Sequence, residues 1–134
     1  MKIAGVTIQG IIKKAIAQYT RDNTAVDGDV SYTGIGFSPD VMFVMAFLPN
    51  TSGMSLVHVM GSVVRDVVDV SGGGNPSVYS AGGYFVYITT AAGKAMSAVL
   101  KSVDADGFTL TWTKTGATVA GTIYIDVIAL KLGV

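Results

Sequence analysis

The stretch that most constrains the fold of this chain runs from Asp104 to Lys131 and contains two strand patterns joined by a short loop. In the first pattern, Phe108, Leu110 and Trp112 alternate with threonines. A period of two places these three large apolar side chains on one face of a β-strand and the threonines on the other. The pattern therefore predicts a strand with one buried side and one side that faces water.

The second pattern lacks this alternation. Between Ile123 and Leu130, only Tyr124 and Asp126 interrupt the apolar run. A strand that is apolar on both sides is typical of one that is covered on both faces. We therefore expect a central strand that packs against a second sheet on one side and against another subunit on the other. Ile123 and Ile125, together with the three residues of the first pattern, are predicted core.

Turn signals separate several other apolar segments, among them Val41 to Leu48, Met54 to Val64 and residues 83–90. Asp106 and Gly107 form one of the strongest hairpin signals, because both residue types tolerate positive φ. About eight short strands with turns between them predict an all-β fold, a jelly-roll-like antiparallel β-sandwich, with a barrel as the alternative.

One segment near the N-terminus has apolar residues at intervals of three and four, which is typical of an amphipathic helix. The stripe that we expect to contact a neighbouring subunit or a partner particle consists of Ile8, Ile12, Ile16 and Tyr19. An alternative is that the helix packs across the open end of its own sandwich. The chain is accordingly divided into an N-terminal helix or arm, residues 1–23, and a β-sandwich domain, residues 24–134.

Charge is scarce in this chain: 13% of residues are charged and 50% are apolar, whereas a typical soluble domain has about 25% charged residues. Obligate subunit interfaces are depleted in charge in this way. The scarcity therefore favours a homo-oligomer over the alternative of a monomer with a neutral surface of Ser, Thr and Gly. Nine cations balance nine anions, so neither nucleic acid nor an anionic membrane is expected as a partner.

Membrane insertion and secretion are not expected either. No stretch approaches the roughly 20 apolar residues that a membrane-spanning helix needs. Lys13 and Lys14 fall where the apolar part of a secretion signal would have to be, so we predict no such signal.

Catalytic frames are also missing from the sequence. There is no cysteine and only one histidine, His58, which by itself completes neither a metal site nor a Ser-His-Asp triad. The aspartates that lie close in sequence fall in or near predicted turns rather than in a predicted cleft. We therefore expect a non-enzymatic protein with no catalytic residues, no bound metal and no cofactor.

Three pieces of the sequence together resemble small virion proteins of tailed bacteriophages. They are Val30-Ser-Tyr-Thr-Gly-Ile-Gly-Phe-Ser-Pro-Asp, Ser102-Val-Asp-Ala-Asp-Gly-Phe-Thr-Leu-Thr-Trp-Thr-Lys and Gly121-Thr-Ile-Tyr-Ile-Asp-Val-Ile-Ala-Leu-Lys. In that family a "T-G-x-G-F-x-P" entry and a "D-x-D-G-F-T-L" hairpin bracket a jelly-roll sandwich. The resemblance covers residues 30–131 and does not include the predicted helix.

The resemblance implies a capsid decoration, or cement, protein. Such a protein would form homotrimers, bind the major capsid protein on the assembled head and stabilise it, after synthesis in the host cytoplasm. The alternative is a receptor-binding module in a tail fibre or spike that recognises glycans on the host surface. In that case exposed aromatic residues such as Tyr79, Tyr84 or Tyr87 would stack on sugars.

Overall fold

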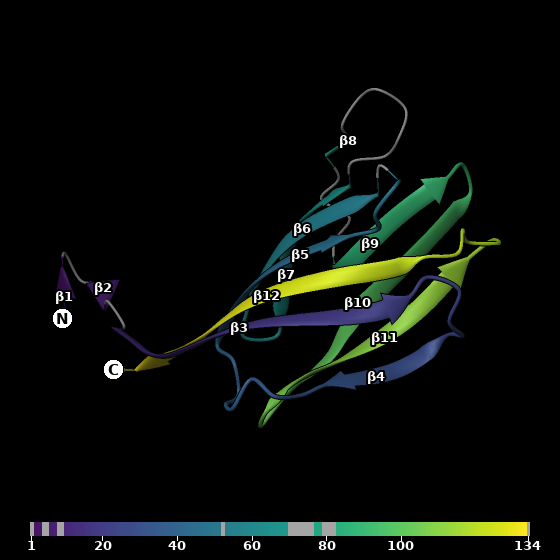
Figure 1. Ribbon diagram of the computed structural model, residues 1–134. Coiled ribbons are helices and arrows are strands. Elements are labelled where there is room, and N and C mark those ends of the chain that lie inside the picture. The colour runs from purple at the N-terminus through teal and green to yellow at the C-terminus, as the bar shows by residue number, and fades with distance from the viewer. Residues whose placement is uncertain are drawn as a thin grey trace.

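A computed structural model describes residues 2–3, 6–7, 10–51, 53–69, 77–78 and 83–133 (Figure 1). Within these residues the chain forms antiparallel strands and no helix. A six-stranded sheet and a four-stranded sheet pack face to face. The predicted all-β antiparallel sandwich is therefore confirmed.

The six-stranded sheet has the order β3-β12-β5-β6-β7-β8. Its strands are β3 (Gly10–Asp22), β5 (Val41–Phe47), β6 (Met54–Met60), β7 (Val63–Asp69), β8 (Ser77–Val78) and β12 (Thr122–Gly133). The closing strand, β12, lies between β3 and β5 and pairs with both of them. The prediction that this strand is internal to a sheet is confirmed.

The four-stranded sheet has the order β4-β11-β10-β9. Its strands are β4 (Gly28–Tyr32), β9 (Tyr84–Ala91), β10 (Lys94–Asp104) and β11 (Gly107–Thr115). The hairpin predicted at Asp106 and Gly107 joins β10 to β11, with Asp104 paired to Gly107. A separate pair of two-residue strands, β1 (Lys2–Ile3) and β2 (Val6–Thr7), precedes both sheets.

The helix prediction is wrong over residues 10–22, which form strand β3. From Ala15 to Arg21 the side chains alternate between half-buried and exposed, which is the period of a strand. Pairing with the whole length of β12 decides the outcome, because long-range packing overrides a local preference for helix. The start of the predicted stripe, Ile8, lies outside the described residues.

The segment from Met54 to Val64, predicted as one apolar unit, is two strands. β6 and β7 form a hairpin whose turn contains Gly61, with φ 62°. The Gly61 N–H donates to the Asp40 carbonyl oxygen at 2.7 Å. A residue that tolerates positive φ is what this tight reversal needs.

The core lies between the two sheets and contains all five residues predicted for it. Its largest fully buried side chains are Trp112, Phe85, Phe108, Met42, Ile88, Met96, Leu110, Ile123, Ile125, Val59 and Val86. The Trp112 indole N–H donates to the Tyr32 hydroxyl at 3.0 Å, and the Arg21 guanidinium lies 4.7 Å from the centre of the Trp112 ring. The one buried indole therefore has both a hydrogen-bond partner and a cation–π contact.

Candidate protein interface

The outer side of the six-stranded sheet, which faces away from the core, is largely apolar. Cross-strand pairing places side chains from four strands in rows across it. One row is Ile16, Ile128, Phe43 and His58, and the next is Gln18, Asp126, Met45 and Leu56. We call Ile16, Phe43, Met45, Leu56 and Ile128 the outer apolar face.

A shallow open groove of about 770 Å³ lies over these two rows. Apart from the apolar side chains, its lining includes Gln18, His58 and Asp126. The Gln18 amide donates to Asp126 Oδ1 at 2.8 Å. Among the residues whose side chains the structure describes, Asp126 is the only carboxylate in the lining, and none of them contributes a lysine or arginine. The described lining of the groove is therefore apolar apart from one amide, one imidazole and one carboxylate.

The exposure of this face is unusual for an antiparallel sandwich. Ile16 is 85% exposed, Phe43 50% and Ile128 47%. An antiparallel sheet that faces water normally carries polar residues on its outer side. Full burial of one such side chain is worth about 1.5–3 kcal/mol, so covering this face with another protein surface would be strongly favourable.

The described members of the predicted contact stripe lie in three different environments. Ile16 belongs to the outer apolar face. Ile12 lies farther along β3 and is 63% exposed. Tyr19 points to the other side of β3, where its ring meets the Tyr32 ring edge to face at 5.1 Å. Burial, followed by the nearby Asp106 carboxylate, raises the Tyr19 pKa.

The remaining members of the outer apolar face were not singled out from the sequence. Phe43 and Met45 lie in the apolar run of β5, where Met42, Val44 and Ala46 are buried. That run is apolar at both odd and even positions. This signal, the same one that β12 gives, is what identifies a strand whose outer side also needs cover.

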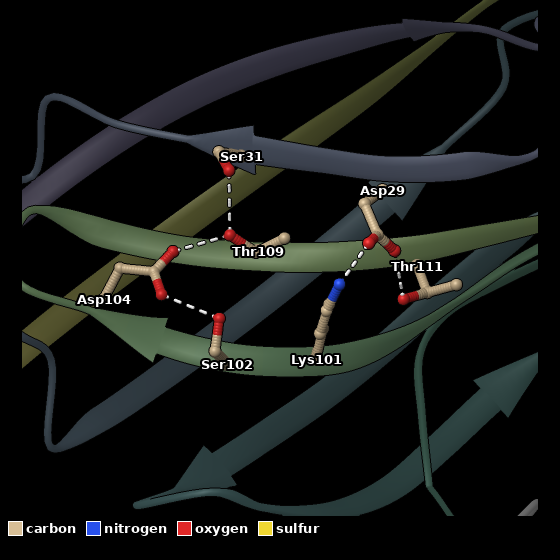
Figure 2. A network of polar contacts seen from close by, with 7 residues as sticks. All are labelled: Asp29, Ser31, Lys101, Ser102, Asp104, Thr109 and Thr111. Carbon is tan, nitrogen blue, oxygen red and sulfur yellow. Dashed lines mark hydrogen bonds and ion pairs between the residues drawn. The ribbon is translucent and has the colours of Figure 1, made fainter.

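The outer side of the four-stranded sheet is different: it carries a network of polar contacts, shown in Figure 2. On β4, Asp29 accepts hydrogen bonds from Lys101 Nζ and from the Thr111 hydroxyl, the latter at 2.6 Å. The hydrogen bond from Lys101, followed by that from Thr111, lowers the pKa of the Asp29 carboxyl below its ordinary value. Lys101 lies at a bulge in β10.

The same network continues along β11. The Thr109 hydroxyl donates to Asp104 Oδ2 at 2.6 Å and lies 2.9 Å from the Ser31 hydroxyl. Because the Thr109 proton is used for Asp104, Ser31 is the donor to Thr109. The Ser102 hydroxyl donates to Asp104 Oδ1 at 2.7 Å. These two bonds, that from Thr109 first, lower the Asp104 pKa. The polar side chains on this face therefore bind one another.

Asp106 joins two of the motifs that the sequence singled out. Its carboxylate accepts hydrogen bonds from the Gly34 N–H at 3.1 Å and from the Gly36 N–H at 2.5 Å. Its carbonyl oxygen accepts one from the Ile35 N–H at 3.2 Å. The neighbouring Gly107 is required because a Cβ there would lie 1.9 Å from the Tyr32 carbonyl oxygen. The entry loop and the hairpin turn thus form one structural unit.

Three other features were considered: a sugar-stacking site at the tyrosines, a metal site and a membrane-spanning segment. Tyr84 and Tyr87 are half-buried, pack against the core and meet each other edge to face at 5.0 Å, while Tyr79 lies outside the described residues. Among the described residues, His and Asp form no group of three or more that could hold a metal ion. No helical segment of the described chain has the length and apolar character that a membrane crossing requires.

No family model, curated protein or solved structure matches this chain. The surfaces of the molecule itself are therefore the basis for assigning a function. Of the described surfaces, the outer apolar face is the one that leaves large apolar side chains exposed in adjacent rows.

Proposed function

We propose that this protein is a non-enzymatic structural component that self-associates through the outer apolar face. The observation that carries this proposal is the exposure of Ile16, Phe43 and Ile128 in one row across three neighbouring strands. An exposed apolar patch with polar surroundings is typical of a protein interface. The low charge content of the whole chain supports the same conclusion.

We further propose that the assembly is a bacteriophage virion, with this protein as a homotrimeric capsid decoration protein. The resemblance to small phage virion proteins supports this step. Two of its motifs are held together by Asp106, so they form one local structure. The resemblance also implies jelly-roll connectivity, a finer expectation than a sandwich. The meanders β5-β6-β7 and β9-β10-β11 give that finer expectation no support.

The mechanism of such a protein is stabilisation by mass action. A protein that binds only the assembled head lowers the free energy of that head by RT ln(1 + [L]/Kd) for each site. Three linked copies raise the effective concentration of each weak contact. No bond is made or broken, so the protein needs only complementary surfaces and a supply of copies from the host cytoplasm.

Self-association is tested by measuring the mass of the protein in solution by size-exclusion chromatography with light scattering. We expect the wild type to be an oligomer and Phe43→Asp to be a monomer, because a carboxylate in the groove would lose its hydration in the interface. The matched control is Val99→Asp on β10, where the wild-type side chain is 40% exposed. This variant adds the same charge to the other sheet and should keep the wild-type mass.

A monomeric wild type at micromolar concentration would refute the self-association proposal. Head binding is tested separately, by cosedimentation of the wild-type protein with assembled heads of the phage that encodes it. Saturable binding at a fixed ratio to the major capsid protein is expected. Binding to tails or to host glycans instead would favour the tail-fibre alternative.

A further inference from the structure

β3 and β12 extend beyond the rest of their sheet as a two-stranded ribbon. Pairing between β12 and β5 ends at Leu130 and Val41, whereas pairing between β12 and β3 continues to Gly133 and Gly10. Figure 1 shows these two strand ends running together away from the other strands. We call residues 10–13 and 131–133 the ribbon. A two-stranded ribbon is marginally stable in water unless something covers it.

The ribbon presents apolar side chains and a positive charge. Ile11 is 59% exposed and Ile12 63%. The Ile12 side chain packs against Gly133, where a Cβ would come within 2.5 Å of Ile12 Cγ2. Lys13 is exposed next to these isoleucines. The ribbon is therefore an apolar surface with a cationic residue beside it.

The base of the ribbon is fixed to the sandwich by Asp40. The Leu132 N–H donates to Asp40 Oδ2 at 2.8 Å, and Lys131 Nζ pairs with Asp40 Oδ1 at 3.1 Å. In return the Asp40 N–H donates to the Leu130 carbonyl oxygen at 2.9 Å. Contacts on both sides of the point where the ribbon leaves the sheet set its direction.

The groove on the outer apolar face has the complementary properties. Its described lining is apolar with Asp126 as the one carboxylate among those residues, whereas the ribbon carries Lys13. The ribbon cannot reach the groove of its own chain. It is the direct continuation of β3 and β12, the same two strands that supply Ile16 and Ile128 to the groove, and folding back would break their pairing. The groove that the ribbon can enter therefore belongs to another copy.

We propose that the ribbon of one copy lies in the groove of the next copy. This inference rests on the proposed function, because it names the occupant of the same face. A contact between two different surfaces of identical chains is heterologous, and it closes a ring when the rotation between copies allows. The arrangement gives each copy one covered ribbon and one covered groove, and a three-membered ring would be the expected homotrimer.

The test uses one ribbon variant, Ile12→Asp, and one groove variant, Phe43→Asp, in the full-length protein. Light scattering should show that each variant alone is a monomer. A mixture of the two in equal amounts should form dimers, because the intact ribbon of the Phe43→Asp chain fits the intact groove of the Ile12→Asp chain. The mixture is measured at about ten times the concentration that saturates wild-type assembly, since a single contact lacks the avidity of a closed ring.

Three results would overturn the inference in ways that can be told apart. If Ile12→Asp keeps the wild-type mass while Phe43→Asp is a monomer, the groove is an interface but the ribbon is not its occupant, and the proposed function survives. If both variants are monomers and their mixture stays monomeric, the two surfaces do not bind each other. A monomeric wild type would remove the proposed function as well.

A milder variant guards against misfolding of the ribbon. Lys13→Asp changes an exposed side chain and should weaken association by about tenfold, the effect of losing about 1.4 kcal/mol of binding free energy. Adding Asp126→Lys to the same chain should restore part of that loss, because the charges of ribbon and groove are then exchanged. An unchanged dissociation constant for Lys13→Asp would contradict the pairing of charges.

Discussion

The outer sides of the two sheets are built by the same strand geometry but lead to opposite surfaces. On the four-stranded sheet, Asp29 and Asp104 accept hydrogen bonds from the hydroxyl and ammonium groups around them. On the six-stranded sheet, Ile16, Phe43 and Ile128 occupy the corresponding outward positions and are exposed. The polar groups of the first face bind one another, whereas the second face leaves large apolar side chains exposed, and under the proposed function another copy covers them.

This difference shows which side of each sheet in a sandwich can carry information about partners. The inner sides of both sheets must be apolar for the domain to fold, so they reveal nothing about partners. The outer sides are free to differ. An outer side that is apolar where polar residues would serve a monomer equally well indicates a contact with another chain.

The largest expected effect concerns the inner sides, which should be equivalent. Leu110→Ala on β11 and Ile125→Ala on β12 each remove a fully buried side chain, one from each sheet. Each should lower the free energy of unfolding by about 2–5 kcal/mol. Urea unfolding followed by circular dichroism measures both losses. A loss of unfolding free energy several times larger for one variant than for the other would show that the two inner sides are not equivalent.

A smaller effect is expected in the polar network. Thr109→Val removes the hydroxyl that links Ser31 to Asp104 and should cost about 0.5–1.5 kcal/mol of unfolding free energy. The mass of the protein in solution should not change. Thr115→Val, at the exposed end of β11, is a control expected to be nearly neutral. Loss of the oligomer in Thr109→Val would show that the polar face is also an interface.

Acid should weaken the polar face before the core. The folded-state pKa values of Asp29 and Asp104 are lowered, so both carboxylates stabilise the fold at pH above their ordinary pKa of about 3.9. That contribution is lost as the pH falls through the lowered values. Carboxyl resonances followed by NMR should therefore titrate below the ordinary range. Asp29→Asn and Asp104→Asn should flatten the acid side of the stability profile, and unchanged profiles would contradict the network.

The smallest effect on folding is expected on the outer apolar face. Ile128→Thr changes an exposed side chain on β12 and should alter the unfolding free energy of the isolated chain by no more than about 0.5 kcal/mol. The same variant should weaken self-association, which dilution experiments monitored by light scattering would show. A large loss of stability in dilute solution, with the oligomer intact, would mean that this face serves the fold rather than the assembly.

Alternation in the sequence was sufficient to predict strand β11 and the side of it that faces the core. Phe108, Leu110 and Trp112 lie in the core and the hairpin forms at Asp106 and Gly107, as expected. These features depend on local patterns. Side-chain direction in a strand alternates with every residue, and turn residues impose their backbone conformation at their own positions. Strand β12 was predictable from a different local pattern, an apolar run at both odd and even positions, which also indicated its central position.

Strand β3 was missed because its spacing fits two structures. Ile12 and Ile16 are four residues apart, a distance that returns to the same face of a helix and also to the same face of a strand. The choice between the two depends on β12, which is more than 100 residues later for most of the paired positions. No local pattern contains that information.

The groove was beyond prediction for a related reason. Its two rows combine side chains from β3, β5, β6 and β12, and their register is set by three separate strand pairings. A shift of one residue in any pairing would turn that strand's outward side chains into the core. The sequence could show that β5 and β12 were apolar on both sides, but not that Ile16 would stand beside them.

The hydrogen bond from the Gly36 amide to the Asp106 carboxylate can be used to follow folding. The carboxylate holds the amide of Gly36, a residue 70 positions earlier in the chain, and contacts this remote in sequence are slow to form because a long loop must close first. Hydrogen exchange at the Gly36 amide should therefore become protected late, after the β10-β11 hairpin already exists. That single amide would record the moment at which the first and last thirds of the chain meet.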